Sequence, residues 1–339
     1  MSSSLTMSMN ATSSQQLRGK QLPAGAWDLF DGVWISVMGY HADEFKFVQG
    51  ETPMSTLPET TAAIAAYLVI IFGGRELMRK REPMKLSFLF KLHNFVLSIL
   101  SGALLAMFIE QLAPTLWKDG LYENICGDDG WTRPLVTLYY LNYITKYVEL
   151  LDTLFLVLKK KPLTFLHTYH HPATAFLCYT QLVGNTSISW VPITLNLTVH
   201  VVMYWYYFQS ARGVKVWWKE WITRLQIAQF VIDLGFVYFA SWDYFVNAYD
   251  LPLPKTGRKK CNGTPFAATM GCVVLTSYLV LFIMFYLNTY IRKSSRRSAK
   301  GAKGTSAVDV KDNVSAVKQS AVKVANGTMA HSVQPLSER

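Results

Sequence analysis

The chain has 339 residues, of which 51% are hydrophobic and 14% aromatic but only 16% charged, and its formal net charge is +11. Its apolar residues gather in blocks of about 20, the length that crosses a bilayer, which argues against a soluble or disordered protein. The positive charge does not indicate nucleic-acid binding, because Lys and Arg are concentrated at the connectors between these blocks.

The chain begins with a Ser-, Thr- and Met-rich segment that shows no secretory signal pattern. We expect residues 1–60 to be flexible, residues 61–291 to form one all-α transmembrane domain, and residues 292–339 to be a flexible basic tail. Seven apolar stretches predict about seven transmembrane helices, at 61–74, 86–111, 134–158, 162–183, 188–210, 222–246 and 265–291. Six is the alternative count, because the first stretch is short and the fourth contains histidines.

The distribution of charge predicts how the chain is oriented. Lys and Arg cluster at 75–85, 159–161, 212–224 and 292–303, which are alternate junctions of a seven-span bundle, whereas the acidic loop 123–130 falls on the other side. The positive-inside pattern therefore places the carboxyl tail in the cytosol and the amino end in a lumen, where Asn10 lies in a glycosylation sequon. Of the four cysteines, only Cys126 and Cys261 lie outside the spans and could pair there.

The fourth stretch contains three of the seven histidines, in "HTYHH". On a helix His167, His170 and His171 share one face, within an arc of roughly 100°. A single membrane histidine often only satisfies a neighbouring carbonyl group, but three on one face indicate a site. Pro172 disfavours helical geometry at His171, so the shared face is firmest for His167 and His170.

Polar side chains follow the same spacing on three other spans. On the third span, Lys146, Glu149, Asp152 and Thr153 share a face, and they form either an ion-pair network between helices, a support for the histidines, or both. Asn196, His200, Tyr204 and Tyr207 do so on the fifth span, and Gln226, Gln229 and Asp233 on the sixth. Counted at ~1.5 Å per residue, the distance to the nearest cytosolic charge is roughly 10–18 Å for His93, Glu149, His170, His200, Gln226 and Gln229. This common depth predicts one polar chamber in the cytosolic half of the bundle.

These residues resemble the ELO family of fatty acid elongases over roughly residues 60–295. The matching motifs are "KLHN", "KYVELLDT", "HTYHH", "NLTVHVVMYWYY" and "TRLQIAQF", in the order of the family. The stretches "KPLTFLHTYHH" and "WWKEW" look most like fungal members that make very-long-chain acids for sphingolipids.

The resemblance implies a multi-pass enzyme of the endoplasmic reticulum membrane that condenses acyl-CoA with malonyl-CoA to 3-oxoacyl-CoA, CoA and carbon dioxide. It implies partners that complete the elongation cycle, namely a ketoreductase, a dehydratase and an enoyl reductase, and no metal or other cofactor. The implied catalytic residues are His167, His170, His171 and His200. His170 would carry the acyl group, or else His170 and His171 would act only as base and oxyanion donor in a concerted reaction. The residues implied to bind or orient substrate are Lys146, Glu149, Asp152, Asn196, Tyr204, Tyr207, Gln226, Gln229 and His93.

Three rival readings are weaker. A membrane di-iron oxygenase needs about eight histidine ligands, and only five histidines lie outside the terminal segments that hold His41 and His331. A transporter would continue its polar residues through the luminal half, where these spans turn apolar. Cys178 as nucleophile lies nearly two helical turns beyond His171, which is too far for contact.

The apolar luminal half predicts a narrow tunnel for an acyl chain. At its far end we expect Phe236, Phe239 and Trp242 to face small residues of the next span, which are Ala267, Ala268 and Gly271. These bulky side chains would then close the tunnel.

Overall fold

The structure, a computed structural model, describes residues 25–256 and 260–291, and all regular structure in these ranges is helical. The all-α prediction is therefore confirmed. The long helices are α2 (Ala26–Met38), α3 (Leu57–Met78), α4 (Ser87–Cys126), α5 (Arg133–Leu158), α6 (Phe165–Val183), α7 (Trp190–Ala211), α8 (Lys219–Ala248) and α9 (Pro265–Tyr286). Short 3₁₀ turns η2 (Ala42–Glu44), η3 (Asp128–Trp131) and η4 (Ser187–Ser189) join them, and a π-helical turn, η5 (Leu287–Ile291), follows α9.

Within the described ranges, five helices are long and apolar enough to cross a membrane, by length and composition: α3, α4, α7 with η4, α8, and α9 with η5. The chain is therefore a multi-pass membrane protein. Helices α5 and α6 have 26 and 19 residues. The charged stripe of α5 and the three histidines of α6 lower their hydropathy. Each of the seven predicted apolar stretches overlaps one of the helices α3 to α9.

Helices α3 and α4 extend furthest beyond their predicted stretches, for local reasons. Helix α3 begins at a capping box in which the Thr56 hydroxyl and the Glu59 carboxylate each bond the other residue's backbone N–H, and it continues through Gly73 and Gly74. Helix α4 turns at Gly120, whose φ of 81° lies in the region that favours glycine, and it then continues to Cys126. Part of the predicted connector is therefore helical.

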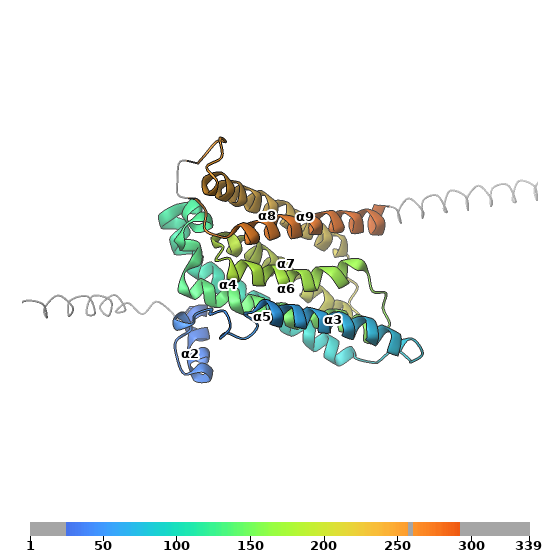
Figure 1. The fold of residues 1–339 in the computed structure, drawn as a ribbon. Coiled ribbons are helices and arrows are strands. Elements are labelled where there is room, and N and C mark those ends of the chain that lie inside the picture. Colours follow the sequence, from blue (N-terminus) through green and yellow to red (C-terminus); the bar gives the residue numbers. More distant parts are fainter. Residues whose placement is uncertain (1–24, 257–259, 292–339) are drawn as a thin grey trace, which may run out of the picture. The chain divides into compact units, whose positions relative to one another are not determined.

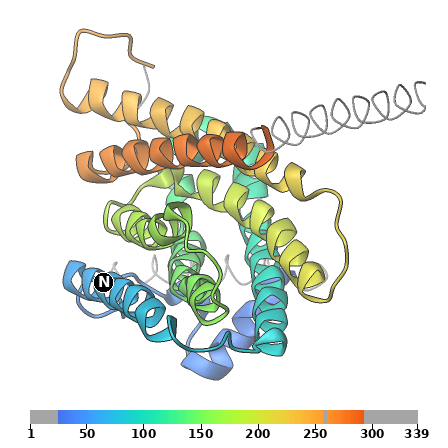
Figure 2. The same ribbon diagram turned by 90° about the vertical axis from the view of Figure 1, so that its right-hand side faces the viewer.

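The chain divides into two compact units, Met1–Phe282 and Ile283–Arg339. In the first unit, Figures 1 and 2 show that the axes of α3 to α7 are roughly aligned, while the chain direction alternates between helices. Helices α8 and α9 lie side by side. The hydroxyl of Ser98 on α4 donates to the carbonyl oxygen of Val201 on α7 at 3.0 Å. In the second unit, the described residues Ile283–Ile291 hold the end of α9 and η5, with the rings of Tyr286 and Tyr290 5.4 Å apart.

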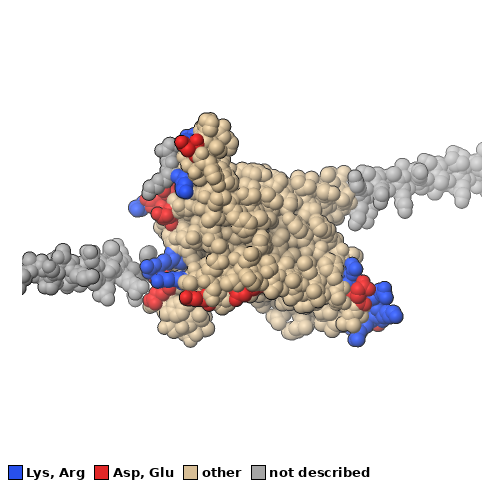
Figure 3. All heavy atoms as spheres, in the orientation of Figure 1, with Lys and Arg blue, Asp and Glu red and all other residues tan. Residues whose placement is uncertain are grey.

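Charged side chains gather mainly toward the two ends of the face seen in Figure 3, with few across its middle. The α3–α4 connector, at the right in Figure 1, exposes Arg79, Lys80, Arg81 and Lys85. The Lys160 ammonium donates to the carbonyl oxygens of Arg79 and Arg81, so two of the predicted basic clusters lie together. This grouping is what the positive-inside pattern requires of connectors on one side.

Of the segment predicted to be flexible, residues 1–60, the structure describes residues 25–60, which contain α2, η2 and the start of α3. Residues 1–24 and the tail 292–339 lie outside the described residues. Helix α2 and η2 pack on the bundle, where Phe45 stacks on Tyr140 at 5.0 Å between ring centroids. The Thr137 hydroxyl donates to the carbonyl oxygen of Ala42 at 2.7 Å. His41 bonds the Asp31 carboxylate at 2.8 Å, which raises the pKa of this histidine. Aromatic side chains in the segment thus anchor it.

Candidate active site

Helix α5 places a cation and an anion in the interior of the bundle. Lys146 and Glu149 are only 2% and 3% exposed, and the Lys146 ammonium donates to Glu149 Oε1 at 2.9 Å. It also donates to Oδ1 of Asn196 on α7 at 2.9 Å. The predicted stripe of α5 is therefore an ion pair that also joins α5 to α7, in a place where an unpaired charge would be very costly.

His200, one turn beyond Asn196 on α7, completes this network. Its Nδ1 lies 3.4 Å from Glu149 Oε1, and the Asn196 amide nitrogen lies 3.1 Å from its Nε2. The arrangement suits the tautomer that carries its proton on Nδ1, because the amide can then donate to Nε2. The four residues Lys146, Glu149, Asn196 and His200 form what we call the inner network.

A second network surrounds Asp152, one turn further along α5. His93 Nε2 on α4 lies 2.8 Å from Asp152 Oδ1, and the hydroxyl of Tyr204 on α7 donates to Oδ2 at 2.8 Å. Both carboxylate oxygens are thus bonded, and α4, α5 and α7 meet at this residue. Tyr207, on the same helix as Tyr204, has its ring centroid 6.4 Å from that of Tyr204.

The histidine box lies on α6, which continues through Pro172 as one helix from Phe165 to Val183. The rings of His170 and His171 are perpendicular with centroids 5.5 Å apart, and those of His167 and His171 are 6.3 Å apart. His167 Nδ1 bonds the Thr164 hydroxyl at 2.9 Å. His171 Nδ1 is buried and bonds no described residue. The three histidines are therefore neighbours, as their spacing predicted.

Tyr278 on α9 positions His170 and was missed by sequence reasoning. Its ring centroid lies 4.6 Å from that of His170, and its hydroxyl donates to the His170 carbonyl oxygen at 3.0 Å. The Thr174 hydroxyl donates to the same oxygen at 2.7 Å. Helix α9 contains no charged or amide side chain, so nothing in its sequence marked Tyr278 as part of a polar face.

The two glutamines of α8 have different surroundings. Gln229 is 5% exposed, and its amide donates to Asp233 Oδ2 at 3.1 Å. The Gln226 amide instead lies 3.5 Å from the sulfur of Met203 on α7.

A cavity runs from these groups between α5, α6, α7, α8 and α9. The predicted residues that line it are Lys146, His170, Asn196 and Gln229, joined by Asn142, Cys178 and Asp233. From this polar end the lining follows each helix in one direction, past Leu177, Val237 and Gly271, to Asn262 and Gly263. The cavity therefore has a polar end and a mostly apolar body.

The prediction of which residues close this cavity is wrong for α8 and correct for α9. Ala267, Ala268 and Gly271 of α9 do line it, but the residues of α8 that face them are Val237, Ala240 and Ser241. Phe239 and Trp242 point outward and are 41% and 47% exposed, and Phe236 is absent from the lining. The face of α8 that lines the cavity is therefore roughly 150° around the helix from the predicted face.

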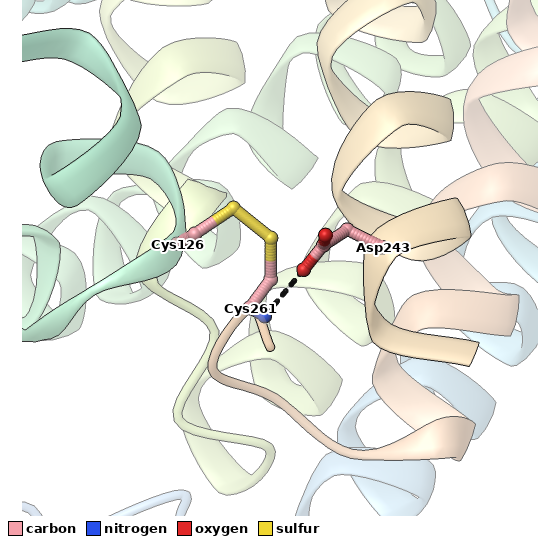
Figure 4. Close-up of side chains that lie close together, drawn as sticks. All are labelled: Cys126, Asp243 and Cys261. Carbon is pink, nitrogen blue, oxygen red and sulfur yellow. Dashed lines mark hydrogen bonds between the residues drawn. A yellow bond between two sulfur atoms is a disulfide. The ribbon is translucent and has the colours of Figure 1, made fainter. Parts of the chain in front are cut away.

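The far end of the cavity lies beside a disulfide between Cys126 and Cys261. The pairing that the sequence allowed is therefore present. Figure 4 shows the Asp243 carboxylate beside it, accepting a bond from the Cys261 backbone N–H at 2.9 Å. The side-chain atoms of these three residues are close enough together to bind a metal ion. Because the two sulfurs are bonded to each other, however, the disulfide joins the end of α4 to the loop before α9.

Comparison with known proteins agrees with the motifs. The family model described as ELO: GNS1/SUR4 family matches residues 52–298. The chain is 48% identical over 313 residues to "Putative fatty acid elongase 1" of Schizosaccharomyces pombe, covering 92% of each chain. It is 44% identical to "Putative fatty acid elongase 2" of the same organism, covering 91% of this chain and 85% of the relative. It is 34% identical to "Fatty acid elongase A" of Dictyostelium discoideum, covering 75% and 90%.

The family match includes all five motifs, from "KLHN" through "TRLQIAQF", and the relatives align with nearly their whole length. The chain therefore belongs to the ELO family.

Proposed function

We propose that the chain is the condensing enzyme of fatty acid elongation, joining acyl-CoA and malonyl-CoA to give 3-oxoacyl-CoA, CoA and carbon dioxide. The observation that carries the proposal is the cavity, which has His170 and the inner network at one end and an apolar body beyond. Its relatives are named fatty acid elongases. We further propose very-long-chain products of the kind found in sphingolipids.

In this proposal His170 accepts the acyl group. An unprotonated ring nitrogen attacks the thioester carbon, CoA leaves as the thiolate, and the proton that the imidazole loses passes to that thiolate. Malonyl-CoA then loses carbon dioxide, and the electron pair left on its carbon forms the new bond to the acyl carbon. The bond from the acyl carbon to the ring nitrogen breaks, and that nitrogen takes up one proton from solvent, which restores the neutral imidazole. The alternative is a concerted reaction in which His170 and His171 only move protons and hold an oxyanion.

The other predicted residues then have supporting roles. The inner network reaches the cavity through Lys146 and Asn196, whereas His200 lies behind this lining. Asn196 orients His200 by its contact with Nε2, and the Glu149 carboxylate lies 3.4 Å from Nδ1. Asp152 joins His93 and Tyr204 and so holds α4, α5 and α7 in register. His167, His171, Tyr207 and Gln226 lie outside the cavity lining, and their proposed contribution is to the position of these side chains or to the CoA portion.

We propose that α5 and α6 also cross the membrane, which gives seven spans. Their polar groups face the bundle interior, where bonds satisfy Lys146, Glu149 and Asp152. The location is the endoplasmic reticulum membrane, with the amino end luminal and the carboxyl end cytosolic, and the acyl chain occupies the apolar body of the cavity. The ketoreductase, dehydratase and enoyl reductase of the cycle are proposed partners.

The test is to incubate purified protein with labelled malonyl-CoA and a panel of acyl-CoAs. We expect labelled 3-oxoacyl-CoA and release of carbon dioxide in equal amounts, with and without strong chelators. Turnover that stops on removal of a bound metal, or that consumes oxygen, would support the oxygenase reading instead.

The narrow wall between α8 and α9 predicts how product length is set. A side-chain carbon added at Gly271 would lie 3.3 Å from Val237, inside the cavity wall. We expect Gly271→Leu to shorten the products, because the leucine side chain would narrow the cavity between α8 and α9. A long acyl chain that passes this point would have to displace packed side chains, at a cost of about 1–3 kcal/mol. The measurement is the distribution of product lengths at matched expression.

A matched control for this variant exists on α8. Gly235 is exposed, and an added carbon there meets no atom within 4 Å. Gly235→Leu adds the same side chain outside the cavity and should leave product lengths unchanged. Identical distributions in both variants would show that the cavity body does not measure the chain.

A further inference from the structure

One buried carboxyl group of the cavity has no role in the networks described above. Asp233 of α8 has no exposed surface and lines the cavity. Its Oδ2 accepts a bond from the Gln229 amide at 3.1 Å, whereas Oδ1 is buried and bonds no described residue. A buried polar atom without a partner is unusual and points to a ligand or to a function.

The level of Asp233 follows from the pairing of α7 and α8. These helices are antiparallel, and Gln226 contacts Met203. Seven residues further along α8 is Asp233, and seven residues back along α7 is Asn196. The free oxygen therefore lies at the depth of Asn196, whose side chain binds Lys146, at the polar end that also holds His170.

The surroundings favour a neutral Asp233. Glu149 and Asp152 have Lys146 and His93 as partners, but among described residues no Lys, Arg or His forms an ion pair with Asp233. An unpaired carboxylate buried in the membrane costs several kcal/mol, so the group is more stable as the acid. Because Gln229 donates to Oδ2, that atom is the carbonyl oxygen and Oδ1 carries the hydrogen.

A neutral acid of this kind donates a hydrogen bond to oxygens that only accept. When malonyl-CoA loses carbon dioxide, the electron pair of the broken carbon–carbon bond moves onto the thioester oxygen as an enolate. A donor placed at this oxygen before the reaction stabilises the charge as it develops. The donor keeps its proton throughout. When the enolate carbon uses the electron pair to form the new bond to the acyl carbon, the negative charge leaves the oxygen, so the oxygen does not need to be protonated.

We propose that Asp233 is held as a neutral carboxylic acid whose Oδ1–H binds the thioester oxygen of the malonyl unit and stabilises its enolate. The proposal rests on the condensing function proposed above. It adds a further catalytic residue to that reaction, and Gln229 is its positioning residue.

Two substitutions test the proposal. Asp233→Asn keeps a neutral side chain of the same shape, and with its oxygen bonded to Gln229 it places an N–H donor at the position of Oδ1. It should keep most of the activity. Asp233→Leu removes the donor and should lower kcat by about 10²–10³-fold with a smaller change in KM for malonyl-CoA. Thermal unfolding of both variants checks that they fold.

Infrared difference spectra give a readout that does not depend on activity. Wild type minus Asp233→Asn should show the carbonyl stretch of a protonated carboxylic acid at neutral pH. A difference that contains only carboxylate bands overturns the proposal, as does an Asn variant as inactive as the Leu variant or a Leu variant with wild-type kcat. Failure of the proposed function is distinguished from these results, because wild type itself would then form no 3-oxoacyl-CoA.

Discussion

Replacing His170 by alanine should lower kcat for condensation by about 10²–10⁴-fold or more, since it removes the acyl carrier or, in the concerted alternative, the general base. The variant should fold, because the bonds that His170 accepts from Thr174 and Tyr278 go to its backbone oxygen, which alanine retains. The measurement is labelled malonyl-CoA incorporation by purified protein, with thermal unfolding recorded on the same preparations.

The same variant distinguishes the two mechanisms. If His170 carries the acyl group, wild type mixed with acyl-CoA alone should release about one CoA per enzyme and gain the acyl mass, and the alanine variant should do neither. The matched control is His41→Ala, which removes an exposed histidine bound to Asp31 and should leave activity unchanged. Ordinary turnover by His170→Ala would remove this residue from the mechanism.

Replacing Lys146 by methionine should destabilise the protein by about 3–5 kcal/mol, because Glu149 would remain buried without its cation. Glu149 is 3% exposed, and the Nδ1 of His200 lies 3.4 Å from its Oε1. Asn196 would also lose the donor to its side-chain oxygen, so the polar end of the cavity should lose its geometry and activity should fall. The measurement is unfolding of the purified protein in detergent as denaturant increases.

A double variant separates the pair from its individual members. Lys146→Met with Glu149→Gln removes both charges and should recover part of the lost stability, since no buried charge is then unpaired. Lys85→Met is the matched control, because Lys85 is exposed on the α3–α4 connector. If Lys146→Met unfolds at the same denaturant concentration as wild type, the ion pair does not support the fold.

The helices and the polar groups in the interior of the bundle could be predicted from the order of amino acids alone. Seven apolar stretches became the helices α3 to α9, since about 20 apolar residues form a helix in a bilayer regardless of their neighbours. The spacing of Lys146 and Glu149, and of Asn196 and His200, placed each pair on one helical face, where they are now bonded. Charged and amide groups in a membrane must face inward, so their direction could be read without a structure.

Which apolar faces meet depends instead on how the helices pack in the folded bundle. Phe239 and Trp242 of α8 are exposed while Val237 and Ala240 line the cavity, and sequence reasoning chose the wrong face. In a soluble protein bulky apolar side chains turn inward, but lipid is as apolar as a protein core, so burial exerts no such selection here. The same holds for the packing of Phe45 on Tyr140, which lie 95 residues apart and carry no local signal of their contact. Polarity thus directs the polar residues of a membrane helix, and shape complementarity between distant segments directs the rest.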